Sequence, residues 1–592
     1  MEMNKKARVK GGEFLLNTAV GVDLFTPEAF TSEQRQIAET TATFVNNEIF
    51  PDLEQMETGD FALVVEKMRR CAELGLFLVD IPEEFGGLEL DKVTSMLVAE
   101  KIGPTGSFAI TSSGQTGIGS LPLVYYGTPA QKQKYLAKLV TAEWIGAYCL
   151  TEPDCGSDPL SSRTTATLSE DGTCYLLNGV KQFITNAAFA DLFTVFAKID
   201  GQHFSAFLVE RNMAGLSIGS EEKKMGLKGT STAQVVFENV RVPVENLLGE
   251  AGKGHKIAFN VLNVGRLKLS ATAIGAAKGA FSEAASYAVE RKQFGQPLSS
   301  FGAIREKLAD MVTSLFAAES LLYRVAGLLD ERIATLDRAG DDYYERYQKA
   351  IEEYAGECAI AKVFCSETLS FVADEALQIH GGYGYIKDYP VERYYRDARV
   401  NRIFEGTNEI NRLLIPTLFF RRADSGALDL WPQVKSVQSG SRLENSEAAA
   451  GDSWFGPEFA LLANQKKLFL LLLSALGEGR NEQELLLGLG DLCIAIYAME
   501  SSLLRAAMTM PGMNTSKQKK ELLQAVVRGI AFETAARFQL AASRCAAYGI
   551  QGAELVALQK TIAELCAYPV VGLLEAKHLL ADAATESGTY PF

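Results

Sequence analysis

Apolar residues recur at helical spacing through the first 140 residues, most clearly over residues 34–56 and 61–76. A spacing of three or four residues places such side chains on one face of a helix, so we expect helices with short breaks here. Proline and glycine in PEEFGG, residues 82–87, predict one such break. Residues 1–142 are therefore predicted to form an N-terminal helical domain.

The pattern changes near Glu143, where short β-branched and aromatic runs replace the helical spacing. These runs fall at residues 173–180, 192–199, 203–210 and 233–243, and turn clusters such as SEDGT and KIDGQ separate them. Short strands at fairly even spacing are typical of a β-barrel or sandwich. We expect a β-barrel domain over residues 143–252.

Beyond Gly254 the helical pattern returns. Apolar positions in residues 304–329 fall on one helical face, which predicts an antiparallel helical bundle over residues 253–422. Residues 423–457 are polar and rich in Gly and Ser, so they are the best linker candidate, and residues 458–592 are helical again. The predicted fold is mostly α with a central β domain.

Composition narrows the functional classes. The chain has 58 Lys and Arg against 73 Asp and Glu, a formal charge of −15, which argues against general nucleic-acid binding. Nine cysteines without a CxxC pair and only four histidines make a metal site improbable and favour a reducing compartment. The longest purely apolar run, Leu468–Leu473, is too short to span a membrane, so we expect a soluble protein.

Four segments carry candidate chemistry. The first, YCLTEPDCGSD at residues 148–158, ends a strand and opens a turn with Thr151, Gly156 and Ser157. Their hydroxyls and exposed N–H groups suit a flat heterocycle with carbonyl and ring-nitrogen acceptors. Taken alone, the segment is more simply a polar corner between a strand and a loop.

The second segment is KQFITN, residues 181–186. Phe183 and Thr185 alternate by two, so on a strand they face the same side and offer an aromatic ring beside a hydroxyl. That pair suits packing against a ring system, although such alternation alone is ordinary for a strand.

The third segment, residues 378–397, contains Gly381, Gly382 and Gly384, which allow a ligand close to the backbone. It is not a dinucleotide fingerprint, because GxGxxG is absent. His380 lies inside the segment, and a lone histidine is more often structural than catalytic.

The fourth segment is IFEGTNEINR, residues 403–412. Thr407 is placed to cap the helix that follows, and Ile403 and Phe404 flank Glu405. Apolar flanks can desolvate a carboxylate and raise its pKa, as a general base for a weakly acidic C–H proton requires. The alternative is an acidic residue favoured by the helix dipole.

Together and in this order, the four segments resemble the acyl-CoA dehydrogenase family. Its two flavin-associated signatures match at residues 149–161 and 378–397, with support from residues 223–243, 245–254 and 290–298. The resemblance covers roughly residues 30–420. The C-terminal extension and the phrases RVKGGEF, NVGR and IFEGTNEI are similar to the very-long-chain branch.

The resemblance implies FAD as cofactor, bound between the β domain and the bundle. Residues expected at the flavin of the same subunit are Tyr148, Cys149, Leu150, Thr151, Gly156, Ser157, Phe183, Ile184 and Thr185, with Thr407 and Glu409 closing the site. Residues expected to reach the FAD of a neighbouring subunit are Arg291, Phe294, Gln378, Gly381 and Gly382. Residues expected at the substrate are Ser157, Asn263, Arg266, Phe404, Gly406 and Gly119.

By the same resemblance, Glu405 takes the α-proton of a fatty acyl-CoA while the β-hydrogen leaves as hydride to the flavin. The Glu405 backbone N–H and an FAD hydroxyl would polarise the thioester carbonyl. Some relatives carry the base immediately before the arginine of NVGR, but that position is Gly265 here. Glu405 is therefore the only candidate that the resemblance supports.

Two departures concern the pocket. Many relatives have tryptophan where this chain has Phe183, and another aromatic still packs on a flavin. Very-long-chain enzymes resemble each other in two pocket-floor glycines, which align with Gly119 and Pro122. Gly119 is expected to leave room for the acyl chain, whereas Pro122 is expected to shorten or redirect its tunnel.

The wider expectations follow the branch. The product would be a trans-2-enoyl-CoA of β-oxidation, the chain preference long, and the electron acceptor an electron-transferring flavoprotein. The C-terminal helices, with LFLLLLSAL beside Lys466 and Lys467, suit a packed bundle better than membrane docking, and a homodimer is expected. Alternatives are an acyl-CoA oxidase and a respiratory-complex assembly scaffold. A bacterial cytoplasm, with peripheral contact at the inner membrane, fits best; the mitochondrial matrix would apply in a eukaryote.

Overall fold

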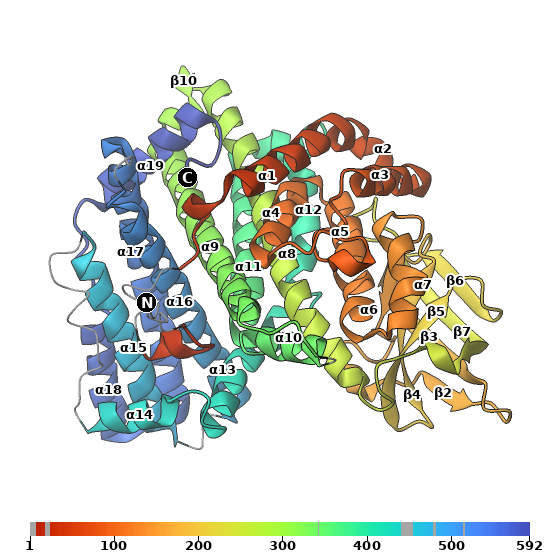
Figure 1. Ribbon diagram of the computed structural model, residues 1–592. Coiled ribbons are helices and arrows are strands. Elements are labelled where there is room, and N and C mark those ends of the chain that lie inside the picture. Colours follow the sequence, from red (N-terminus) through yellow and green to blue (C-terminus); the bar gives the residue numbers. More distant parts are fainter. Residues whose placement is uncertain (1–7, 18–23, 341, 440–453, 478–480, 513–515) are drawn as a thin grey trace, which may run out of the picture.

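The computed structural model describes residues 8–17, 24–340, 342–439, 454–477, 481–512 and 516–592. Figure 1 shows the N-terminal helices and the β domain on one side, long helices in the middle and the C-terminal helices on the other side. The helices before the sheet are α1 (Ser32–Phe44), α2 (Leu53–Glu57), α3 (Phe61–Glu73), α4 (Lys92–Ile102), α5 (Ser107–Gly114), α6 (Leu121–Tyr126) and α7 (Pro129–Val140). The predicted N-terminal helices are confirmed, and a short helix over Glu83–Phe85 occupies the predicted break.

The predicted strands form one eight-stranded sheet. They are β1 (Gly146–Cys149), β2 (Thr165–Leu168), β3 (Cys174–Thr185), β4 (Leu192–Ile199), β5 (His203–Glu210), β6 (Leu216–Glu221), β7 (Thr232–Pro243) and β8 (Leu247–Leu248). The hydrogen-bonded order is β6-β7-β3-β2-β4-β5-β8, and β1 pairs in parallel with β4. Alternating apolar side chains of β3, β4, β5 and β7 fill a core of the sheet itself.

Long helices follow the sheet and form the middle of the molecule. They are α8 (Gly254–Glu290), α9 (Gly302–Ala334), α10 (Tyr343–Glu352), α11 (Ala355–His380), α12 (Val391–Ala398) and α13 (Asn408–Asp424), with a small hairpin of β9 (Lys292–Gln293) and β10 (Gln296–Pro297) between α8 and α9. Helix α9 was expected to bury one face. Almost every residue from Leu308 to Leu329 is buried instead, because helices of the C-terminal region cover its outer side.

The C-terminal region is a packed helical layer. Its helices are α14 (Leu430–Gln438), α15 (Gly456–Leu476), α16 (Gln483–Thr509), α17 (Lys517–Gly549), α18 (Gly552–Leu565) and α19 (Leu573–Ser587). Helix α14 lies inside the predicted linker, whose residues 440–453 lie outside the described part of the chain. Lys466 is buried against Glu500 at 2.7 Å, which supports the packed interpretation of the leucine-rich run.

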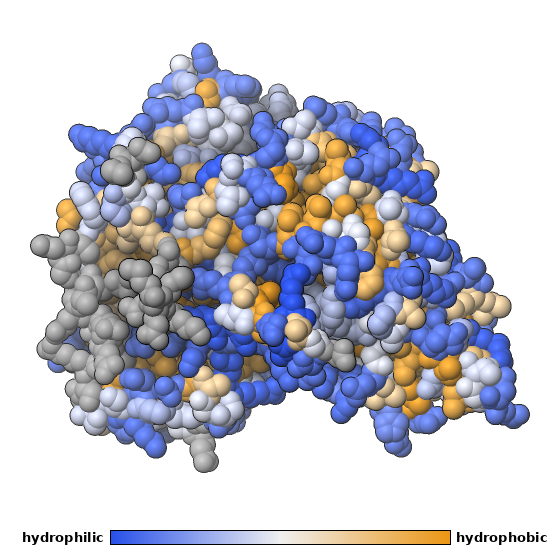
Figure 2. Space-filling view, viewed as in Figure 1, coloured by the Kyte–Doolittle hydropathy of each residue, from blue (hydrophilic) through white to orange (hydrophobic). Residues whose placement is uncertain are grey.

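Three of the described helices, α9, α15 and α16, are long and apolar enough to cross a membrane by length and composition. The sequence analysis expected no membrane-spanning helix, because it considered only uninterrupted apolar runs. That criterion did not identify these three helices. In their most apolar windows, 94%, 61% and 72% of the residues are buried inside the protein. Figure 2 shows a mainly hydrophilic surface on one face, with apolar side chains gathered over parts of the N-terminal helices and the β domain.

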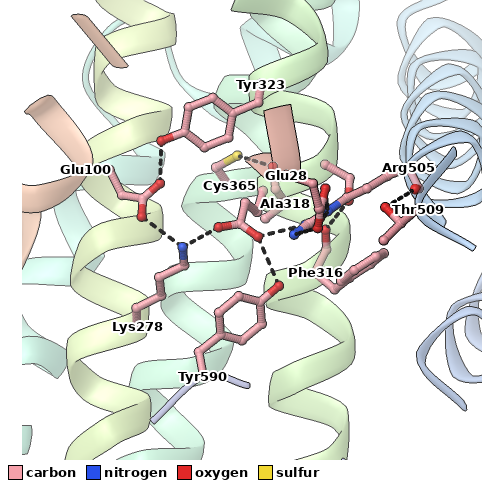
Figure 3. Close-up of polar contacts among 12 residues, drawn as sticks. Glu28, Glu100, Lys278, Phe316, Ala318, Tyr323, Cys365, Arg505, Thr509 and Tyr590 are labelled. Atoms are coloured by element: carbon pink, nitrogen blue, oxygen red, sulfur yellow. Dashed lines mark hydrogen bonds and ion pairs between the residues drawn. The ribbon is translucent and has the colours of Figure 1, made fainter. Parts of the chain in front are cut away.

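A buried charge cluster joins the C-terminal layer to the bundle (Figure 3). Arg505 of α16 contacts Glu319 of α9 at 2.7 Å and Glu28, just before α1, at 2.9 Å. Lys278 of α8 pairs with Glu319 and, at 2.8 Å, with Glu100 of α4. Each charge in this cluster therefore faces a charge of opposite sign.

Candidate active site

Glu405 lies in a tight loop directly before α13. Its φ is 57° and that of Gly406 is 82°, so two consecutive residues adopt the left-handed conformation. That conformation is costly for a non-glycine residue and persists only where surrounding contacts hold it. The Thr407 hydroxyl accepts the Ile410 N–H at 3.2 Å, which confirms the predicted cap of α13.

The Glu405 carboxylate points at α8. Its Oε2 atom has no solvent access and no hydrogen-bond partner among the described residues. A Cβ atom on Gly265 of α8 would lie 2.9 Å from that Oε2. The helix can accept the carboxylate here only because residue 265 has no side chain. Gly265 and Glu405, the two positions at which relatives are expected to carry the base, therefore lie next to each other.

Two cations flank Glu405, and both bind main-chain carbonyls. The Arg266 Nε donates to the Glu405 carbonyl at 3.3 Å, and its Nη1 donates to Asn263 Oδ1 at 3.0 Å. Lys362 of α11 donates to the Gly406 carbonyl at 2.7 Å. Burial raises the pKa of Glu405 to about 7, although Arg266 and Lys362 oppose the rise. Glu405 is thus poised between acid and base at neutral pH.

The turn after β1 is held from below by a buried ion pair. Lys181 of β3 contacts Glu152 at 2.7 Å and donates to the Leu150 carbonyl at 3.2 Å. The carboxylate of Glu152 also accepts the backbone N–H groups of Arg163 and Thr164. This clamp fixes a turn on which Gly156 and Ser157 are exposed, and nothing lies within 4 Å of a Cβ built on Gly156.

Phe183 and Thr185 are both accessible to solvent at the end of β3. Phe183 is 60% exposed and Thr185 is partly exposed. The arrangement departs from a regular strand, because Phe183 has φ 58° and the pairing with β7 shifts register between Lys181 and Ile184. The bulge turns the aromatic ring outward.

Three of the predicted cofactor residues turn their side chains away from this open side. Cys149 and Ile184 lie in the core of the sheet, so only their main-chain groups can reach a ligand. The Tyr148 ring packs edge-on against Phe196, and its hydroxyl donates to the Ala258 carbonyl of α8 at 3.4 Å. The charge of Glu405 adds to burial in raising the pKa of Tyr148, so the strand end and the base share one environment.

A second group of predicted residues lines a separate surface pocket of 530 Å³. Arg291, Gly381 and Gly382 line it, and the Arg291 guanidinium lies 5.3 Å from the Tyr383 ring centre. Phe294 on the neighbouring hairpin is 94% exposed, and Gln378 is exposed. No residue of the Glu405 group lines this pocket. His380 is buried and stacked on Tyr287, which suits the predicted structural role.

Gly119 does not open a space at the place where its side chain would stand. A Cβ there would lie 2.6 Å from the Gly114 carbonyl oxygen and 3.2 Å from the backbone of Gly146. The absent side chain lets the π-helix Gln115–Gly119 pack directly on β1. The expected room for an acyl chain is therefore taken by backbone, and Pro122 is buried in the first turn of α6.

Another cavity does not have Glu405 in its lining. It has a volume of 770 Å³ and lies between α9, α11 and α13 on one side and α16 and α17 on the other. Arg402 and Glu409 are among its lining residues, so it reaches the start of α13. Lys362, in contrast, contacts the base loop directly, and the sequence analysis missed it. A single lysine within the apolar run AIAKVF was the available signal.

Comparison with known proteins places this geometry in a family. Models for the N-terminal, middle and C-terminal domains of acyl-CoA dehydrogenase match residues 31–143, 147–240 and 252–417. A probable acyl-CoA dehydrogenase of Bacillus subtilis (strain 168) is 44% identical over 528 residues, which is 88% of this chain and 89% of the relative.

Two further proteins cover different shares of the chain. The mitochondrial very long-chain specific acyl-CoA dehydrogenase of Homo sapiens is 38% identical over 72% of this chain and 62% of its own. A crystal structure of an acyl-CoA dehydrogenase complexed with FAD from Bacillus anthracis has a TM-score of 0.94 and 43% identity, and the match covers 98% of this chain and 100% of that one. The likeness to that structure includes the C-terminal helices.

Proposed function

This chain belongs to the acyl-CoA dehydrogenase family of FAD-dependent oxidoreductases, and we propose that it oxidises long-chain fatty acyl-CoA thioesters to trans-2-enoyl-CoA in β-oxidation. The proposed preference for long acyl chains is supported by the similarity of this protein to a very long-chain specific acyl-CoA dehydrogenase. The observation that carries the chemistry is the buried, unpartnered Oε2 of Glu405 against Gly265.

The residues around the open side of β3 fit a flavin. Phe183 offers an exposed aromatic face, Thr151 and Thr185 offer hydroxyls at a partly exposed surface, and Gly156 leaves space beside its backbone. Gly381 and Gly382 likewise have nothing within 4 Å of a built Cβ, which suits the second half of a dinucleotide from a neighbouring subunit. When bound, FAD supplies hydride acceptance.

The chain's own residues supply the proton chemistry. The Glu405 carboxylate would take the α-proton, because a pKa of about 7 leaves it largely ionised in mildly alkaline solution and still strong as a base. Asn263 and Arg266 keep their polar groups beside this position. The half-buried Phe404 and the loop around it would limit the access of water.

The substrate carbonyl needs a hydrogen-bond donor, and the base loop provides one. The Glu405 N–H has no acceptor in the described part of the chain. A thioester oxygen placed there would gain a donor aimed at the atom where negative charge develops. The left-handed backbone at Glu405 and Gly406 is what would aim the N–H and the carboxylate at one substrate.

The test is an anaerobic titration of the purified holoenzyme with palmitoyl-CoA, followed by flavin absorbance. Stoichiometric bleaching is expected. A flavin that stays oxidised with acyl chains from C4 to C20 would reject the proposal, and a rate maximum at C4 to C6 would reject the long-chain preference. Reoxidation of the reduced enzyme by oxygen, faster than by electron-transferring flavoprotein, would favour an oxidase.

We further propose that the protein forms a homodimer and acts in a bacterial cytoplasm. A homodimer would cover Phe294, which is 94% exposed, and bring Arg291 to the neighbouring cofactor, where its guanidinium suits a pyrophosphate. Sedimentation should give twice the chain mass, and a monomer or tetramer would contradict it. We place the enzyme in a bacterial cytoplasm, with electron-transferring flavoprotein as partner; co-sedimentation with lipid vesicles tests peripheral membrane contact.

A further inference from the structure

Lys362 is a fully buried lysine whose ammonium group lies beside the catalytic loop. It projects from α11 and donates to the Gly406 carbonyl and to Asn408 Oδ1, each at 2.7 Å. Asn408 is itself fixed, because its amide donates to Ser366 at 3.1 Å and to Glu367 at 3.0 Å. The position of the Lys362 ammonium group is therefore fixed by these contacts.

The backbone at Glu405 and Gly406 needs contacts that hold its conformation. Glu405 and Gly406 are both left-handed, and relaxation of either would swing the Glu405 carboxylate away from Gly265. Arg266 holds the Glu405 carbonyl from α8, and Asn411 Nδ2 holds the Gly406 carbonyl at 2.8 Å from α13. Lys362 adds the contact from α11, so three helices grip the loop.

Burial lowers the pKa of Lys362 to about 7, although Glu405 opposes the fall, so the ammonium and the Glu405 carboxyl titrate in the same pH range and the charge of each acts on the other. Other charged and titratable groups surround Lys362 and Glu405. They are Arg266 on α8, Cys358 and Glu367 on α11, Glu409 on α13 and Tyr148 on β1. Neither Lys362 nor Arg266 hydrogen-bonds the Glu405 carboxylate. A direct pair would occupy its lone pairs, whereas a cation on the neighbouring carbonyl stabilises the anion and leaves the oxygen free.

We propose that Lys362 is a positioning residue of this reaction: it holds the Gly406 carbonyl so that Glu405 faces the substrate, and its ammonium form stabilises the Glu405 carboxylate without pairing with it. The inference rests on the proposed function, since it names a residue that acts through the proposed base.

The test uses Lys362→Gln, which keeps a donor and loses the charge, and Lys362→Arg, which keeps the charge. The rate of flavin bleaching by palmitoyl-CoA and the melting temperature are measured for each holoenzyme from pH 5.5 to 9. For Lys362→Gln we expect the acid limb to move to higher pH by roughly 0.5–1 unit and the rate at pH 7 to fall about tenfold. For Lys362→Arg we expect a lower rate with the acid limb at or below its wild-type pH, because arginine stays charged across this range.

An acid limb in Lys362→Gln that coincides with the wild-type limb would overturn the proposal, as would a loss of melting temperature that is equal at every pH with an unchanged rate. If Lys362→Gln does not yield holoenzyme, an arginine variant whose acid limb moves to higher pH overturns the proposal. Lys278→Met, at a partly buried lysine of the cluster in Figure 3, is the control and should melt earlier with an unmoved limb. A wild-type enzyme that does not bleach would instead reject the proposed function.

Discussion

Two groups of buried charges in this protein follow opposite rules. In the cluster of Glu28, Glu100, Lys278, Glu319 and Arg505, carboxylates face cations directly, as at the 2.7 Å contact of Arg505 with Glu319 (Figure 3). Around Glu405 the side chains of Arg266 and Lys362 bind carbonyls, and the Oε2 of the carboxylate has no hydrogen-bond partner among the residues that the structure describes.

The electrostatic result differs accordingly. Burial alone would raise the pKa of Glu319, but Lys278 and Arg505 hold it well below its usual range. Burial does raise the pKa of Glu405, because Arg266 and Lys362 bind the neighbouring main-chain carbonyls and not the carboxylate itself. A directly paired carboxylate joins helices and is a poor base at neutral pH, whereas one left unpaired costs stability and is ready to take a proton.

The largest effect that separates the two groups should come from Glu405→Gln. The amide cannot accept the α-proton, so we expect flavin bleaching by palmitoyl-CoA to slow by about 10³–10⁴-fold with the flavin still bound. Stopped-flow absorbance measures this. Full-speed bleaching in the variant would show that the unpaired carboxylate is not the base.

Breaking the paired cluster should instead affect folding. Arg505→Met removes the cation that faces Glu28 and leaves Glu319 with Lys278 alone, and loss of one partner from a buried ion pair typically costs about 3–5 kcal/mol. Chemical denaturation measures the loss. Arg537→Met, at an exposed pair with Glu533, should be nearly silent, and an equally small effect in Arg505→Met would remove the distinction between the groups.

The cost of the unpaired carboxylate should appear as pH-dependent stability. The pKa of Glu405 rises from 4.5 to about 7 on folding, so its protonated form favours the folded state at low pH and this contribution is lost as pH rises through 7. Glu405→Gln should therefore be more stable than wild type by about 3 kcal/mol at pH 8 and nearly equal at pH 4. Denaturant melts across this range measure it; a pH-independent difference would count against the raised pKa.

Gly265→Ala should give the smallest effect. Its methyl group would stand 2.9 Å from Glu405 Oε2, and the end of that side chain can move aside. Alanine also favours a helix interior over glycine by about 1 kcal/mol, so we expect unchanged or slightly higher stability and roughly tenfold slower bleaching. Gly302→Ala, with open space around it, is the control, and equal rates in both would contradict the steric argument.

The sequence predicted the features that depend on local pattern. The cap at Thr407 and the strands follow from spacing and residue type. The raised pKa of Glu405 was also predicted, but from its flanks, and Ile403 is in fact 50% exposed. The carboxylate is also covered by a residue distant in sequence, Gly265 of α8.

The features that the sequence did not reveal arise from contacts between distant elements. Lys362 reaches Gly406 from 44 positions away, which no local pattern encodes. Gly119 was assigned to the acyl tunnel, yet its place is set by β1, a strand more than 25 residues later in the chain. The full burial of α9 likewise required the C-terminal helices, whose packing against it was not predicted.

The titration of the Glu405 carboxyl group tests the central claim most directly. Infrared spectra of the holoenzyme with ¹³C-labelled glutamate should show a buried protonated-carboxyl band that disappears with a midpoint near pH 7 and is absent from Glu405→Gln. If no such band titrates above pH 5, the carboxylate is paired or solvated, and the contrast between the two groups of charges does not hold.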